Sequence, residues 1–173
     1  MKTLAIIVLN WNGASDTLEL LGTLARCRAP EGWRLRTLVV DNGSTDGSAE
    51  RIAAAYPDVG LLELPDNLRF AGGNNAGLER ARADGADAIM LLNNDTEADP
   101  GLCERLVMAL EQDPSAGAAA PLIYFAAPTD LIWYAGGGCV PALGASCAPR
   151  PALARPRPVP RRRDRRATSP AAA

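Results

Sequence analysis

The sequence contains no histidine. This absence excludes Ser-His-Asp and Cys-His catalysis, and it also excludes metal sites built on imidazole nitrogen. Any chemistry must therefore rest on carboxylates, amides, hydroxyls, backbone groups or a hard metal ion bound by oxygen atoms.

Cysteine is scarce, and its spacing is uninformative. The four cysteines, Cys27, Cys103, Cys139 and Cys147, include no Cys-x-x-Cys pair. The sequence therefore carries neither a zinc signature nor a disulfide framework, and we expect free thiols in a reducing cytosol.

Long apolar runs are also missing, since none approaches the roughly 20 residues of a membrane span. The first residues, MKTLAIIVLNWNG, hold an apolar stretch of only about seven residues, without a small-residue cleavage site. This start predicts a β-strand rather than a signal peptide. With 173 residues, of which 47% are hydrophobic and 22% charged, the composition is that of one soluble globular domain.

Strand and helix patterns alternate along the chain. Continuous apolar runs predict buried strands, whereas apolar residues at helical spacing predict helices, the first of them capped by Ser15 or Asp16. The order implies an α/β domain with a mostly parallel sheet and helices on both faces. The predicted strands are 4–10, 36–41, 59–64, 87–93 and a fifth at 118–125 weakened by Pro121, and the predicted helices are 15–28, 48–56, 74–83 and 101–112.

Polar clusters follow each of the first four predicted strands. Open parallel sheets bind ligands in the crevice beyond the carboxyl ends of their strands, so these clusters are expected to converge on one binding edge. They are Asn10-Trp11-Asn12, Asp41-Asn42-Gly43-Ser44, the segment Asn67 to Asn75, and Asn93-Asn94-Asp95.

Two of these clusters also have simpler interpretations. The stretch DNGSTDG can be a turn in which Asp46 caps the next helix. The stretch AGGNNAG (71–77) can offer backbone amides to a phosphate at a helix N-terminus, or it can be an ordinary glycine-rich loop. Neither G-x-G-x-x-G nor a Walker A lysine pattern is present, which argues against a dinucleotide dehydrogenase and a P-loop enzyme.

Asp95 has two possible roles. It can cap the helix that follows, although Asp99, immediately before Pro100, is better placed to do so. A spare carboxylate after two amides at a strand end also suits Mg²⁺ or Mn²⁺, which take one or two carboxylates together with substrate phosphate oxygens.

Five stretches in this order resemble family 2 of the glycosyltransferases, in the rhamnosyltransferase-like variant. They are VLNWNG, VVDNGSTDGS, NLRFAGGNNAGL, LLNNDTEADPG and IWYAGG, and the resemblance covers about residues 3 to 137. The resemblance implies the Rossmann-like GT-A fold of nucleotide-diphosphosugar transferases. It further implies sugar transfer from a UDP- or dTDP-linked donor to a glycan or lipid-linked acceptor in cell-surface polysaccharide synthesis. A cytoplasmic location, with peripheral association at the inner face of the membrane, and no nucleic acid partner are expected.

The resemblance also implies roles for individual residues. Asp41 looks like the family's acidic residue that binds the nucleotide base, while the backbone around Leu9 and Asn10 lines the base and ribose. Asn93-Asn94-Asp95 resembles the family's Asp-x-Asp element, with Asp95 as ligand to Mg²⁺ or Mn²⁺ and Asn93 where many members carry Asp. The segment along the nucleotide and diphosphate comprises Asn67, Arg69, Gly73, Asn74 and Asn75.

Arg69 departs from the family pattern, because related sequences often have glycine there. If the position requires a positive φ, arginine introduces strain. Alternatively, its side chain reaches the diphosphate.

The C-terminal part differs in composition from the rest of the chain. Residues 150–173 hold eight arginines and one acidic residue, Asp164, which leaves ten basic and nineteen acidic residues in 1–149. Of the 35 residues from Cys139 onward, 25 are Ala, Arg, Pro or Gly, and they show no apolar periodicity. We therefore divide the chain into a nucleotide-sugar-binding part, 1–137, and a disordered Ala/Arg/Pro-rich tail, 138–173.

A shift of reading frame near Gly138 in a GC-rich gene is one explanation for this tail. The family's catalytic base lies well after a segment like IWYAGG, and no such acidic segment follows here, so its position is unknown. On this view the chain is a donor-binding fragment without transfer activity. The alternative is a genuine basic tail that binds nucleic acid or anionic membrane, on a non-catalytic nucleotide-sugar-binding or interaction module.

Overall fold

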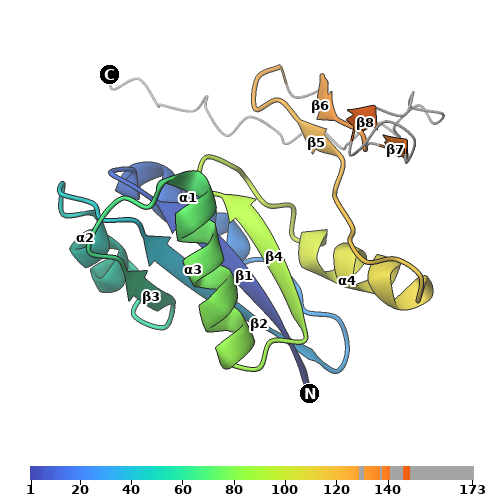
Figure 1. Cartoon of the computed structure of the whole chain (residues 1–173), viewed down its shortest axis with the longest axis horizontal. Helices are drawn as coiled ribbons and strands as arrows, with labels where there is room; N and C mark the ends of the chain where they lie inside the picture. Colours follow the sequence, from blue (N-terminus) through green and yellow to red (C-terminus); the bar gives the residue numbers. More distant parts are fainter. Residues whose placement is uncertain (129–130, 137, 141–145, 149–173) are drawn as a thin grey trace, which may run out of the picture. The chain divides into compact units, whose positions relative to one another are not determined.

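The structure is a computed structural model, and it describes residues 1–128, 131–136, 138–140 and 146–148 (Figure 1). The chain forms two compact units, Met1–Ala119 and Ala120–Ala173. The first unit contains every predicted site residue.

The first unit is built on a parallel sheet of four strands, as the sequence predicts. The order β3-β2-β1-β4 places β1 in the centre, with β2 and β4 on either side. The short strand β3 pairs only with Leu38–Asp41 of β2, so β2 residues 33–37 pair with β1 alone. The strands are β1 (Lys2–Asn10), β2 (Trp33–Asp41), β3 (Gly60–Glu63) and β4 (Ala88–Asn93).

Helices cover both faces of this sheet, which confirms the predicted layers. Successive residues of β1 point to opposite faces, so the central strand contributes to two separate cores. One core joins Ile6 and Val8 to α1, α2 and α4, and the other joins Ile7 and Val40 to α3 (Figure 1). The helices are α1 (Ala14–Leu24), α2 (Ser48–Ala55), α3 (Arg69–Ala83) and α4 (Leu102–Gln112).

Helix α3 begins at Arg69, five residues before the predicted start at Asn74. The whole of the glycine-rich stretch 71–77 is therefore helical, which agrees with the helix-start interpretation rather than the loop, and two of its glycines serve packing. A Cβ at Gly77 would lie 2.7 Å from Ile7 Cγ2, and one at Gly73 would lie 2.5 Å from Leu9 Cδ1. Because real Cβ atoms do not approach so closely, these glycines let α3 lie nearer the sheet than a larger residue allows.

The prediction for α1 is wrong at both ends. The helix begins at Ala14, after Gly13, and neither Ser15 nor Asp16 caps it; it ends at Leu24 rather than Arg28. Gly13 is favoured because a Cβ there would lie 3.0 Å from Asn94 Nδ2, so the polar end of β4 leaves no room for a side chain. A tighter turn after Leu24 replaces the last predicted helical residues.

The thiols of the first unit are free, as predicted. Cys103 is fully buried between α4 and the sheet, and burial raises the pKa of its thiol to about 12. Burial also raises the pKa of Cys27, which packs against the same core. Both therefore remain protonated near neutral pH and act as small apolar side chains.

The second unit contains short antiparallel pairs. Strand β5 (Ile123–Tyr124) pairs with β6 (Ile132–Tyr134), so the predicted strand 118–125 is reduced to its last part, beyond Pro121. Within the predicted tail the structure describes β7 (Gly138–Val140) paired with β8 (Ser146–Ala148). The rest of that tail, and the reading-frame hypothesis with it, lies outside the described residues.

The helices described in the structure were also compared with the dimensions of a bilayer. None of those in the described ranges is both long enough and apolar enough to cross one.

Candidate nucleotide-sugar site

The centre of the candidate site is a buried carboxylate, Asp41, at the end of β2. Its side chain is 3% exposed, and Oδ1 accepts hydrogen bonds from Asn10 Nδ2 at 2.7 Å and from Ser44 Oγ at 2.6 Å. Oδ2 accepts a third bond, from the Ser44 backbone N–H at 3.0 Å. The parallel register places Asn10 opposite Asp41, so the predicted meeting of the first two polar clusters is found.

The Asn10 side chain connects this carboxylate to the other side of β1. Its Oδ1 accepts a bond from Thr17 Oγ1 of α1 at 2.8 Å, and Thr17 Oγ1 accepts one from Asn94 Nδ2 at 3.2 Å. Side chains from β1, β2, α1 and the end of β4 thus form one continuous chain of hydrogen bonds. Asn10, Asp41 and Asn94 were predicted site residues, and the structure brings all three together.

The residue after Asp41 organises the start of α3. Asn42 Oδ1 accepts the Leu68 N–H at 3.0 Å, and its Nδ2 donates to Asn67 Oδ1 at 3.0 Å. Asn67 Oδ1 also accepts the Arg69 N–H at 2.7 Å. These two amide side chains satisfy N–H groups that a helix start otherwise leaves unpaired, which explains why α3 begins at residue 69.

Arg69 adopts a left-handed backbone conformation, with φ of 61°. Strain was expected here if the position had a positive φ, and it does. In this conformation a side chain crowds the backbone carbonyl. The Arg69 side chain is exposed at the beginning of α3, beside Asn67.

Replacing Arg69 with glycine is expected to raise the free energy of unfolding by about 0.5–1 kcal/mol, because relief of left-handed strain exceeds the entropic cost of glycine. Urea unfolding followed by circular dichroism measures this change. Arg82→Gly in the same helix is the matched control, and it should destabilise the protein by about 1 kcal/mol. Equal losses of stability in the two variants would contradict the assignment of strain.

Titration of Arg69→Gly with UDP tests the second expectation, that the Arg69 side chain reaches the diphosphate. If it does, its removal should lower the affinity for UDP.

The end of β4 presents Asn93 and Asp95 outward and Asn94 inward. Both Asn93 and Asp95 are exposed, whereas Asn94 is half-buried against Thr17. Thr96 Oγ1 donates to the Asn93 carbonyl at 2.7 Å and closes a tight turn here. Asn93 ends β4 and Asp95 follows it, so both lie at the carboxyl edge of the sheet, where Asp41 ends β2.

Asp99, rather than Asp95, stabilises the start of α4. Asp99 Oδ1 accepts the Gly101 N–H at 2.8 Å and pairs with Arg105 Nη2 at 3.0 Å. Asp95 takes part in none of the hydrogen bonds or ion pairs found among the described residues. The helix begins at Leu102 with Gly101 at its N-cap, so the prediction that Asp99 caps it directly is wrong; Asp99 instead stabilises the turn that precedes the helix.

The side chains at the end of β4 would hold a hard divalent cation only together with oxygen atoms of a bound ligand. In the described part of the chain, no three acidic, cysteine or histidine side chains gather in a metal-binding group. Asp95 supplies one carboxylate and Asn93 one amide oxygen, and Mg²⁺ or Mn²⁺ commonly completes such a partial set with substrate phosphates and water. The residues present fit a cation that arrives with a diphosphate.

Other predicted site residues lie under α3 or on it. The Leu9 side chain packs toward Gly73, away from the Asn10 amide on the opposite face, which leaves only its backbone near the site. Asn74 is buried and donates to the Phe70 carbonyl within α3 at 2.8 Å, and Asn75 is exposed on the helix. Their assignment to the diphosphate stays a prediction.

Sequence reasoning missed Thr17 entirely and gave no role to the Ser44 hydroxyl. Ser44 Oγ accepts bonds from Asn10 Nδ2 at 3.2 Å and from the Asn12 N–H at 2.9 Å. A threonine inside a predicted helix gives no signal of its own. Only its position on the face that meets β1 and β4 reveals the role.

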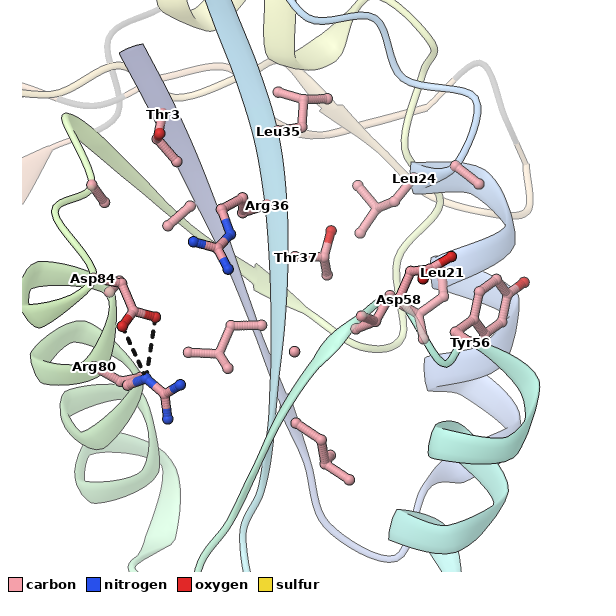
Figure 2. Close-up of a pocket in the computed structure, with 18 of the residues that line it drawn as sticks. Thr3, Leu21, Leu24, Leu35, Arg36, Thr37, Tyr56, Asp58, Arg80 and Asp84 are labelled. Carbon is pink, nitrogen blue, oxygen red and sulfur yellow. Dashed lines mark hydrogen bonds and ion pairs between the residues drawn. The ribbon is translucent and has the colours of Figure 1, made fainter. Parts of the chain in front are cut away.

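A recess of about 420 Å³ lies at the opposite end of the strands (Figure 2). It opens before the start of β3, where the first part of β2 has no second neighbouring strand. Arg36 points to the α3 side, near the Arg80–Asp84 ion pair, while Leu35 and Thr37 point toward α1 (Figure 2). None of the predicted site residues lines this recess, so it is separate from the candidate site.

The parallel sheet, its helices on both faces and the polar carboxyl edge define an α/β domain of the nucleotide-diphosphosugar transferase type, the GT-A fold. The chain belongs to the glycosyl transferase family 2, whose model matches residues 5–163. The resemblance inferred from the sequence is thereby confirmed.

Individual relatives agree with this family. The chain is 33% identical over 94 residues to the N-acetylglucosaminyl-diphospho-decaprenol L-rhamnosyltransferase of Mycobacterium tuberculosis, in strains CDC 1551 / Oshkosh and ATCC 25618 / H37Rv. This match covers 50% of the chain and 31% of the relative.

Two solved structures share the fold. S. aureus TarS 1–349 in complex with UDP has a TM-score of 0.54 at 20% identity, covering 70% of this chain and 38% of its own. The mannosyltransferase PcManGT from Pyrobaculum calidifontis in complex with GDP-Man and Mn²⁺ has a TM-score of 0.53 at 24% identity, covering 66% and 33%. The chain thus spans about a third of the length of these relatives.

Proposed function

We propose that residues 1–119 bind a nucleoside-diphosphate sugar at the carboxyl edge of the sheet, as the donor site of a glycosyltransferase. The observation that carries this proposal is the burial and hydrogen bonding of the Asp41 carboxylate. Both oxygens of this buried carboxylate accept hydrogen bonds from Asn10 or Ser44, which fix it at the end of β2, and Oδ2 accepts a single one.

An ionised carboxylate offers about four lone-pair directions. Asn10 and Ser44 use both directions of Oδ1, and the Ser44 N–H uses one of Oδ2. One direction of Oδ2 is left for a ligand N–H, which matches the single imide N–H of uracil or thymine. This supports a UDP- or dTDP-linked donor.

The diphosphate is placed by the proposal between the start of α3 and the end of β4. Phe70 and Ala71, exposed in the first turn of α3, carry backbone N–H groups of the kind that bind phosphate oxygens. Asn93 and Asp95 would hold Mg²⁺ or Mn²⁺ together with the diphosphate. When bound, such a cation neutralises the negative charge that the leaving nucleoside diphosphate gathers.

The reaction class follows from the family and its relatives. Family 2 members and the mycobacterial rhamnosyltransferase support transfer of a sugar from the donor to a hydroxyl group. The name of that relative includes a diphospho-decaprenol carrier, which supports a lipid-linked acceptor. An acceptor of this kind would place the reaction at a membrane surface, which accords with the expected peripheral association at the cytoplasmic face.

Isothermal titration of the full 173-residue chain tests the proposal. Uridine, UDP, dTDP and GDP are titrated with and without Mn²⁺, and ATP serves as a non-cognate control. We expect UDP or dTDP to bind in preference to ATP, and Mn²⁺ to increase the affinity of the diphosphates but not of uridine. Equal binding of all ligands, or no binding, would refute the donor site.

Sugar transfer is measured separately from donor binding, because the chain spans only about a third of the length of its relatives. Incubation with UDP- and dTDP-sugars and a polyprenyl-diphosphate acceptor, followed by mass spectrometry of the lipid, detects any glycosylated product. Donor binding without product would favour a donor-binding module, whereas product formation would place the catalytic base among the carboxylates of this chain.

A further inference from the structure

Thr17 of α1 lies between the two ends of the proposed site. It is fully buried, and its single hydroxyl makes two hydrogen bonds. It donates to Asn10 Oδ1, the residue that binds Asp41, and it accepts from Asn94 Nδ2, the residue next to Asp95. No other side chain described in the structure joins these two asparagines directly.

Asn94 anchors the turn that carries Asp95. Its amide is held against α1 by the bond to Thr17, whereas Asn93 and Asp95 on either side of it are exposed. The space around the Asn94 amide is narrow, since a Cβ on Gly13 would lie 3.0 Å from its Nδ2. The amide therefore has one well-defined partner on α1, and that partner is Thr17.

We propose that Thr17 is a positioning residue that couples the base-binding end of the site, Asn10 and Asp41, to the cation-binding end, Asn94 and Asp95. This inference rests on the proposed donor-binding function and adds a residue outside the sequence motifs. Thr17 contacts neither ligand itself. It acts by fixing the separation and orientation of the two loops that do.

Valine is the informative replacement, because it keeps the branched shape of threonine but neither donates nor accepts a hydrogen bond. In Thr17→Val, Asn94 Nδ2 and Asn10 Oδ1 each lose a partner, and the residue next to Asp95 loses its bond to α1, whereas Ala98 further along the loop keeps its bond to Thr23. The Asp41 bonds to Asn10 Nδ2 and Ser44 remain. The loss should therefore fall mainly on the cation-dependent part of diphosphate binding.

The experiment measures the UDP affinity of the full chain with and without Mn²⁺. We expect Thr17→Val to reduce the factor by which Mn²⁺ increases UDP affinity by about tenfold, the range for one buried hydrogen bond. Uridine binding, which needs no cation, should change by no more than about twofold. Thr17→Ser keeps the hydroxyl and should restore most of the Mn²⁺ effect.

Thr23→Val provides the control for a merely structural effect. Thr23 is also a buried threonine of α1 whose hydroxyl makes two bonds, to the Leu20 carbonyl at 2.8 Å and from the Ala98 N–H at 3.0 Å. The Thr23→Val variant should lower the melting temperature as Thr17→Val does. It should leave unchanged the factor by which Mn²⁺ increases the affinity for UDP. Asn94→Ala removes the Thr17 bond from the other side without altering α1, so it decides the matter if Thr17→Val does not fold.

Three results would overturn the inference, and they have different consequences for the donor site. If the wild-type chain shows the Mn²⁺ effect and both Thr17→Val and Asn94→Ala retain it, Thr17 has no positioning role, while the donor site stands. An equal reduction in Thr23→Val would likewise assign the effect to general loss of stability. If the wild-type chain binds no UDP under either condition, the donor site itself is refuted, and the positioning role with it.

Discussion

Replacing Asp41 with alanine is expected to weaken the binding of nucleosides and nucleotides alike by about 1.5–3 kcal/mol, the range for a hydrogen bond to a charged group. The carboxylate binds the base in our proposal, so uridine and UDP should lose the same amount. Because the cation lies at the other end of the site, the loss should be independent of Mn²⁺. Isothermal titration of both ligands, with and without the metal, measures all four affinities.

The controls for Asp41→Ala must separate binding from folding. The substitution also removes the acceptor of bonds from Asn10 and from the Ser44 backbone, so circular dichroism should first establish that the variant folds. Asp46→Ala removes another carboxylate from the same loop, one that accepts bonds from Ser48 at the start of α2, and should leave affinity unchanged. Intact uridine binding in folded Asp41→Ala, with only the diphosphate contribution lost, would contradict the assignment to the base.

Replacing Asp95 with alanine is expected to weaken Mn²⁺-dependent UDP binding by at least roughly tenfold, because a hard cation loses its charged protein ligand. Uridine binding should not change, since it involves no cation. Asp95→Asn should recover little, because an amide oxygen supplies geometry without charge. Titration of UDP at several Mn²⁺ concentrations yields the metal-dependent part of the affinity directly.

Asp99→Ala is the matched control for this experiment. Asp99 lies four positions from Asp95, and its carboxylate holds Gly101 and Arg105 at the start of α4. The variant should lose stability, by about 1 kcal/mol for the lost hydrogen bond to the Gly101 N–H, while its Mn²⁺-dependent affinity stays at the wild-type level. Mn²⁺ dependence that persists unchanged in Asp95→Ala would remove the metal assignment from that residue.

The sequence predicts the sheet of this protein better than the boundaries of its helices. Most of β1 and the segment Leu38–Val40 of β2 are apolar because both faces of the sheet are covered there, and this pattern is local and easily recognised. The start of α3 is not local, since it depends on the Asn42 side chain, which reaches the segment from another strand. The packing role of Gly77 was not predicted for the same reason, because the atoms that require a glycine there belong to β1 and β2.

The candidate site shows the same division. The polar strand ends could be predicted, since parallel strands bring their carboxyl ends to one edge, and the direct bond from Asn10 to Asp41 follows from their shared register. Thr17 could not be predicted, because its role depends on the order of the strands. Only with β4 beside β1 does one residue of α1 reach both Asn10 and Asn94.

The close approach of α3 to the sheet also limits how this sequence can change. A Cβ at position 77 would meet Cγ2 of Ile7 at 2.7 Å and Cγ2 of Val40 at 3.0 Å. The space for a larger residue on the helix must therefore come from a smaller residue on a strand. Positions 77, 7 and 40, widely separated along the chain, should exchange residues jointly among related sequences, with alanine at 77 accompanied by loss of a methyl group from one of the two strands.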